Sequence, residues 1–271
     1  MSREVEQSTA GPGTASKVNL RVLFRVTIEK ELIILRRYWF NTVGGLGANY
    51  VMFLLIFFGG RTVTPTLVTE NLTGIIVGFF IWTMSWNSFQ SSAQTLTREA
   101  RWGTLEQTYM SPYGLFSVIS TRIAVRLSYT LVIGLLMLVF MMITTQKWIW
   151  IDPVSVVPLA AITMLSATGL GYAFGGLALV YKRVSSIFTI IQVLLLGAIS
   201  APAGQLTNLL PLAWGTDLIV VVISEGISLW QLPAADLVGM TAVTMGYLSV
   251  GYIVFGYAVN LTKRRGIMGH Y

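Results

Sequence analysis

The sequence LSYTLVIGLLMLVFMMITTQ occupies residues 127–146 and contains no charged side chain. An α-helix needs about 20 predominantly apolar residues to cross a hydrocarbon core of roughly 30 Å. Because only helices and closed barrels satisfy their backbone polar groups in lipid, such runs predict helices. Five further uncharged runs cover residues 38–60, 71–97, 153–181, 184–216 and 237–262. We therefore expect an all-α integral membrane protein with six transmembrane helices.

The run 184–216 is too long for one ordinary span, and Pro202 and Pro211 interrupt it. We expect a fifth span that ends near residue 200, followed by short re-entrant or interfacial helices over residues 201–230, on the outer side. Together the spans form one membrane domain over residues 38–271. The expected spans cover about 41–60, 72–95, 115–146, 154–181, 185–200 and 236–261.

The charges are sorted by side. If both termini are cytoplasmic, all but two of the 18 cations lie inside, and only Arg61 and Lys147 lie outside. An excess of Lys and Arg in cytoplasmic segments sets membrane orientation, so this arrangement predicts a multi-pass protein of the cytoplasmic membrane with both termini inside. The cations are spread over separate segments, which argues against a nucleic-acid partner for this basic chain. Membrane lipids are expected contacts.

The first 37 residues precede the spans. Residues 1–18 are rich in Ser, Thr, Gly and Pro, which predicts a disordered cytoplasmic tail without a cleavable signal peptide. Residues 19–37 carry an apolar stripe at helical spacing beside basic residues, which predicts an amphipathic interfacial helix. The alternative is a cytoplasmic extension of the first span. The stripe consists of Leu20, Phe24, Ile28, Leu32 and Leu35.

Small and aromatic residues mark several spans. Gly44, Gly45 and Gly47 in the first span, and Gly171 with Gly175 in the fourth, predict close helix packing. The second span carries aromatic side chains on one face, together with a glutamine. Either they pack within the bundle or they line a cavity for an apolar substrate. These candidates are Phe79, Trp82, Trp86, Phe89 and Gln90.

The sequence TREARWGTLEQTYMSP occupies residues 97–112, between the second and third spans. Gly103 bends the segment, Thr104 caps a short helix over residues 105–110, and Pro112 ends that helix. A plain connector needs no such helix. This pattern predicts an ordered cytoplasmic helix that lies across the membrane normal.

The residues offer little catalytic chemistry. His270 is the one histidine, and there are no cysteines. No GxxxxGK[ST] phosphate loop is present, so no ATP site or other cofactor site is expected on this chain. The spans carry no ionisable residue near their middle, which argues against ion-coupled transport, and they lack groups suited to intramembrane hydrolysis.

The segment GTLEQTYMSP at 103–112, which follows REARW, resembles the cytoplasmic loop of ABC-2 type exporter permeases, especially those of the daunorubicin and multidrug type. The order of parts is also similar: an amphipathic helix, six spans, and a broken outer segment before the last. Gln107, Thr108 and Tyr109 depart from the apolar or basic residues that are frequent there.

The resemblance implies a half-channel that pairs with a second permease subunit, usually a second copy, above two copies of a separate ATPase that binds ATP and Mg. The loop would be the coupling helix, and the first, second and fifth spans would line the substrate path, which adds Gln192 as a candidate. No metal site on this chain is implied. The implied coupling residues are Glu99, Arg101, Gly103, Thr104, Leu105, Glu106, Tyr109 and Pro112.

The leading hypothesis is therefore a non-enzymatic permease subunit of an ATP-driven exporter for amphipathic or hydrophobic molecules. A polysaccharide or glycolipid exporter shares the layout. An intramembrane lipid-modifying enzyme and a secondary transporter are the rivals from other classes, and the residues above argue against both.

Overall fold

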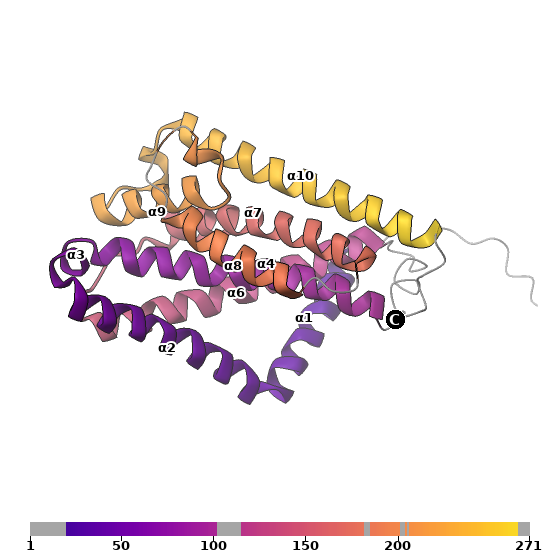
Figure 1. Cartoon of the computed structure of the whole chain (residues 1–271), viewed down its shortest axis with the longest axis horizontal. Helices are drawn as coiled ribbons and strands as arrows, with labels where there is room; N and C mark the ends of the chain where they lie inside the picture. The colour runs from indigo at the N-terminus through magenta and orange to yellow at the C-terminus, as the bar shows by residue number, and fades with distance from the viewer. Residues whose placement is uncertain (1–19, 102–114, 182–184, 201–203, 205, 265–271) are drawn as a thin grey trace, which may run out of the picture.

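The computed structural model describes residues 20–101, 115–181, 185–200, 204 and 206–264 (Figure 1). These residues form helices and connecting turns and contain no strand, so the expected all-helical fold is confirmed. The chain order is α1 (Leu20–Arg37), α2 (Trp39–Val63), α3 (Pro65–Glu70), α4 (Leu72–Arg101), α6 (Leu115–Thr145), α7 (Pro153–Val180), α8 (Ser185–Ile199), η1 (Thr207–Leu209), α9 (Ala213–Glu225), η2 (Leu229–Gln231) and α10 (Ala234–Arg264).

Five of the described helices are long and apolar enough to cross a membrane. Their spanning segments are Trp39–Val63, Leu72–Thr95, Ser117–Thr145, Pro153–Ala178 and Ala234–Thr262. They correspond to the first, second, third, fourth and last expected spans. The expected fifth span corresponds to α8, whose 15 residues reach only about 22 Å at 1.5 Å per residue. By length alone α8 falls short of a hydrocarbon core.

Helix α7 is the centre of the bundle and touches both α4 and α10 along its length. Glycines make these contacts close. A Cβ at Gly171 would lie 2.6 Å from the Phe89 carbonyl oxygen of α4, and one at Gly251 of α10 would meet the Gly169 backbone. Backbones approach this closely only where the side chain is hydrogen. The packing role predicted for Gly171 is thus confirmed.

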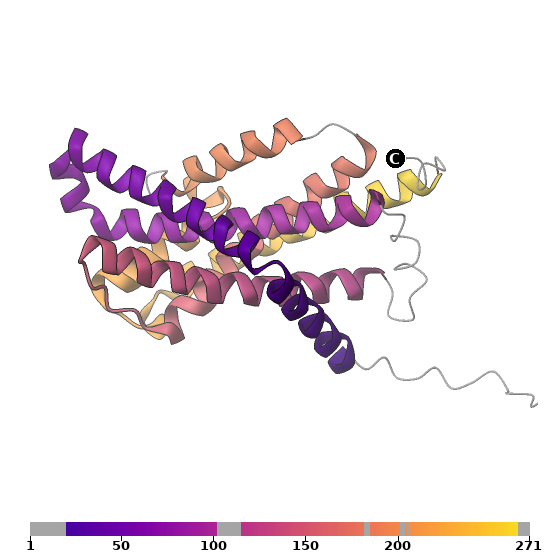
Figure 2. The ribbon, with the colours of Figure 1, turned by 90° about the horizontal axis from the view of Figure 1, so that it is seen from below.

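Helices α7 and α10 run in the same direction. Gly169 lies against Tyr247, and Gly176, further along α7, lies against Phe255, further along α10. The chain must therefore return along the bundle between these helices. Helix α8 makes the return and ends on the side where α9 lies (Figures 1 and 2).

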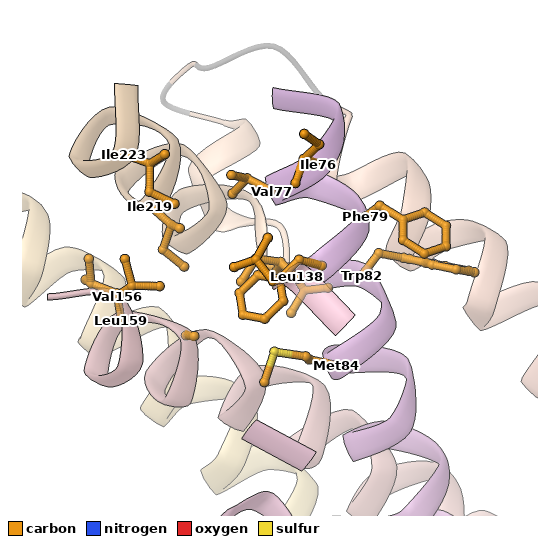
Figure 3. Close-up of a cluster of buried hydrophobic side chains, with 14 of the residues drawn as sticks. Ile76, Val77, Phe79, Trp82, Met84, Leu138, Val156, Leu159, Ile219 and Ile223 are labelled. Atoms are coloured by element: carbon orange, nitrogen blue, oxygen red, sulfur yellow. The ribbon is translucent and has the colours of Figure 1, made fainter. Parts of the chain in front are cut away.

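The largest apolar cluster fills the space where α4, α6, α7 and α9 meet (Figure 3). Ile76 and Val77 of α4 face Ile219 of α9, with Val156 of α7 and Leu138 of α6 beside them. Burial of these side chains holds α9 against the bundle, at the end that carries α3. The 13 residues of α9 are too few to span, as expected for the segment 201–230.

A polar contact fixes the same end. Asp152 caps α7 by accepting a hydrogen bond from the Val154 backbone N–H at 3.1 Å. The Ser155 hydroxyl donates to Asp152 at 2.5 Å and accepts from the Leu229 backbone N–H of η2 at 2.8 Å. These bonds join the start of α7 to the segment before α10.

The residues around α1 and α2 pack more loosely. α1 is helical as predicted, and it packs against α6 and meets α2 at a bend near Tyr38. Nothing lies within 4 Å of a Cβ built at Gly44, Gly45 or Gly47. The prediction that these glycines pack closely against another helix is wrong for the single chain. The predicted tail 1–18 lies outside the described residues.

Candidate functional site

The candidate site is a cavity of about 410 Å³ between α2, α4 and α6, which we call the polar cavity. It lies in the half of the bundle nearer the start of α2 and the end of α4. Amide side chains from α2 and α4 surround it, which is unusual among apolar spanning helices. These amides belong to Asn41, Asn49, Asn87, Gln90 and Gln94.

Hydroxyl groups and one cation complete the polar lining. Arg126 of α6 is the charged side chain among the described lining residues. Around the Tyr129 hydroxyl lie the Thr42 side chain and the charges of Arg126 and Glu31. The hydroxyl-bearing residues that line the cavity are Thr42, Thr83, Ser91, Tyr129 and Thr130.

Several of these groups have unused hydrogen-bonding capacity. The Thr83 side chain is 5% exposed, and its hydroxyl has no hydrogen-bond partner in the part of the chain that the structure describes. Among the described residues, Asn87 donates to the Thr83 carbonyl of its own helix alone, at 2.7 Å. Since a buried polar group without a partner costs about 1–3 kcal/mol, the Thr83 hydroxyl favours a polar occupant of the cavity.

A second hollow, of about 550 Å³, adjoins the polar cavity between α1 and α6; we call it the α1–α6 groove. Phe24, Ile28, Leu32 and Leu35 of the predicted apolar stripe form its α1 wall. Val132 belongs to the α6 wall. The stripe thus faces α6 across a groove. Thr42, Arg126, Tyr129 and Ile133 line both hollows, so they meet at these residues.

The predicted aromatic candidates lie elsewhere. The centroid of the Phe79 ring lies 5.3 Å from that of Trp82 and 5.4 Å from that of Phe53 of α2. Both Phe79 and Trp82 point away from α9 (Figure 3). Trp82 donates to the Gln192 backbone carbonyl of α8 at 3.3 Å. The structure therefore brings Phe79, Trp82 and Gln192 together as a packing contact between α2, α4 and α8.

The remaining candidates divide between packing and the polar cavity. Phe89 is fully buried against Phe174 and Phe188, and the half-buried Trp86 stacks on it at 5.5 Å. Gln90 is the candidate that lines the polar cavity, in the described part of the chain. The face that was predicted as one unit is thus split.

The sequence signal for the polar cavity was available but missed. Thr83, Asn87 and Gln90 follow Trp82, Trp86 and Phe89 by one residue each, so the polar stripe is the aromatic stripe turned by about 100°. Gln90 belongs to the polar stripe. The Asn41–Gly45–Asn49 spacing on α2 and the Arg126–Thr130–Gly134 spacing on α6 repeat every fourth residue and give matching faces.

The predicted coupling residues divide in another way. Glu99 and Arg101 lie in the last turn of α4. The other predicted coupling residues lie outside the described residues; they are Gly103, Thr104, Leu105, Glu106, Tyr109 and Pro112.

Over the described residues there is no group of three His, Cys, Asp or Glu that could hold a metal ion. No family model matches the chain, and no curated protein matches it either.

Proposed function

We propose that this chain is the permease subunit of an ATP-driven exporter for amphipathic molecules in the cytoplasmic membrane. The observation that carries the proposal is the polar cavity within a bundle of membrane-spanning helices. Its described lining offers amides, hydroxyls and one guanidinium, groups that bind a substrate without acting as general acid or base near neutral pH. Such a lining suits passage of a molecule better than chemistry on it.

The energy would come from a separate ATPase, present in two copies with bound ATP and Mg. The support is the resemblance of residues 103–112 to the coupling loop of ABC-2 permeases, together with the lack of a phosphate loop in this chain. Two permease subunits, most simply two copies of this chain, would form the complete channel. The exposed apolar face of α2 is available for lipid or for that second subunit.

The proposal includes six spans, with α8 as the fifth. The parallel direction of α7 and α10 supports this, because the chain between them returns along the bundle and α8 lies on that return. A short span is accommodated by local thinning of the bilayer. Both termini are then cytoplasmic, and α3 and α9 are outside.

Cysteine labelling tests this topology, because the chain has no cysteine of its own. In intact cells, an impermeant thiol reagent should label Thr66→Cys on α3 and Glu225→Cys on α9, both at exposed positions, and should spare Ser8→Cys. Lysed cells provide the control, since all three variants should react there. Labelling of Ser8→Cys alone in intact cells would reverse the orientation, and protection of Glu225→Cys alone would remove α8 as a span.

A second experiment tests the source of energy. The purified chain should not hydrolyse ATP, whereas the complex isolated from its native membrane should do so. Leu105→Asp should weaken the association with the ATPase, because it places an unpaired charge in a packed contact. Thr66→Asp on α3, which the proposed topology puts outside the cell, is the matched control. Hydrolysis by the isolated chain, or unchanged assembly of Leu105→Asp, would reject the proposal.

A further inference from the structure

We propose that the polar cavity and the α1–α6 groove form one binding site for an amphiphile with a single negative charge and hydroxyl groups on its head. The head occupies the polar cavity, and the hydrocarbon chain lies in the groove. This inference deepens the proposed function. The role of the amphiphile as exported substrate rests on the proposed function, whereas the existence of the binding site does not.

The charge of the head follows from Arg126. Arg126 is the charged side chain among the described residues that line the polar cavity. It makes no salt bridge with another described residue, since the salt bridge in that part of the chain joins Arg25 and Glu29. A guanidinium among spanning helices is stabilised by an anionic partner. A cationic head would meet repulsion at the same place. Arg126 therefore selects an anionic head.

Glu31 limits that charge to one. Its side chain lines the groove together with Arg126 and Tyr129, which also line the polar cavity. A second negative charge on the head would face this carboxylate, which is unfavourable in a partly desolvated site. A monoanion contacts Arg126 without that cost.

The hydroxyl groups follow from the amides and from Thr83. Each amide side chain offers both donors and acceptors, and a hydroxyl both donates and accepts. The amides of Asn41, Asn49, Gln90 and Gln94 make no hydrogen bond within the described chain, and the buried Thr83 hydroxyl has none either. A head with hydroxyl groups satisfies both kinds of group, whereas a bare phosphate, which mainly accepts, leaves acceptors unused.

The chain of the amphiphile follows from the groove. Its walls expose Phe24, Ile28 and Leu32 of α1 and Val132 of α6, the last at 64%. The groove meets the polar cavity at Arg126 and Tyr129, as a headgroup joined to a hydrocarbon chain requires. An apolar wall of this kind stabilises a bound chain by roughly 0.8 kcal/mol for each buried CH₂ group.

The test uses the purified chain in phosphatidylcholine nanodiscs, with a fluorophore on a single introduced cysteine. Ser128→Cys places the fluorophore on the exposed α6 wall of the groove, and Ile253→Cys places it on the exposed face of α10 as a control. The probe is phosphatidylglycerol with a nitroxide on its acyl chain, which has one negative charge and a glycerol head. Nitroxide-bearing phosphatidylcholine at the same mole fraction is the reference lipid.

We expect phosphatidylglycerol to quench the Ser128→Cys fluorophore with roughly tenfold higher apparent affinity than phosphatidylcholine, as a charge-assisted hydrogen bond provides. The two lipids should quench the Ile253→Cys fluorophore equally. Arg126→Gln should abolish the preference, while Arg126→Lys should retain much of it. Arg122→Gln removes the same charge one turn away, outside both hollows, and should leave the preference intact.

Three results would overturn the inference. Equal quenching of the Ser128→Cys fluorophore by both lipids would show ordinary surrounding lipid. A preference that survives in Arg126→Gln would place the anion elsewhere. Displacement of the lipid by millimolar inorganic phosphate would show an anion site without the groove. Because no ATPase is present, failure here leaves the proposed function standing, and loss of ATPase association leaves this binding result standing.

Discussion

The two sides of α4 show two ways of packing membrane helices. On the side of α7, backbone meets backbone: Gly171 of α7 lies against Phe89, and α7 in turn meets α10 through Gly169 and Gly251. On the side of α2, the polar cavity lies between the helices, and Gly45 faces open space. We call these the closed side and the open side. The same residue type, glycine, creates contact on one and room on the other.

The largest effect is expected from a bulky residue on the closed side. Gly251→Leu should destabilise the fold by about 3 kcal/mol or more, because the new side chain must displace the Gly169 backbone. Thermal unfolding in detergent, followed by size-exclusion chromatography, measures the change. Gly246→Leu on the same helix and Gly45→Leu on the open side have free space and should unfold near the parent temperature. Equal destabilisation by all three would erase the distinction between the sides.

A smaller change in the free energy of unfolding is expected when two buried threonines are replaced by valine, with a loss on the closed side and a gain on the open side. Thr168 of α7 donates to the Met164 carbonyl at 3.1 Å, so Thr168→Val should cost about 0.5–1 kcal/mol. The Thr83 hydroxyl has no partner among the described residues, so Thr83→Val should stabilise the empty protein by about 1 kcal/mol. Chemical denaturation of both variants tests this. A cost for Thr83→Val as large as that for Thr168→Val would show that the hydroxyl is already satisfied.

The smallest effect concerns Asp217 of α9, which packs on the closed side. Burial raises the pKa of this carboxyl above its ordinary 3.8. The folded state then favours the protonated carboxyl. Asp217 therefore contributes fully to the free energy of unfolding below its ordinary pKa of 3.8, and this contribution is lost as the pH rises through the folded-state pKa. Asp217→Asn should therefore gain stability relative to the parent above that window and match it below. Unfolding temperatures measured across pH test this, with Glu225→Gln on the same helix as the control.

The sequence predicted much of the closed side. Uncharged runs of sufficient length gave the spans, and the Gly171 pattern gave close packing, because both depend on residue type and local spacing. The return of the chain through α8 depends on the parallel arrangement of α7 and α10, which no local pattern encodes. Hence six crossings were predicted from hydropathy, while the described helices include five of spanning length.

The sequence predicted little of the polar cavity. Gln90 was grouped with aromatic neighbours, although one residue of helical rotation separates the two faces. Asn41, Asn49 and Arg126 come from helices distant in sequence, and only their assembly makes one hollow. Gly45 was expected at a contact, because small residues indicate close approach without specifying whether another helix is present.

The clamp at Asp152, Ser155 and Leu229 has a mechanical consequence. It fixes the bundle at the end where α4 begins, while the polar cavity lies toward the other end of that helix. The clamp holds the start of α7, and α4 packs backbone to backbone on α7 at Phe89, so a tilt of α7 about its clamped start carries α4 with it. The 28 residues of α7 make a lever of about 42 Å. A rotation of about 5° around its clamped end moves the far end by about 4 Å, roughly three quarters of the rise of one helical turn. Small tilts at the fixed end are thereby amplified where α4 leads into residues 102–114.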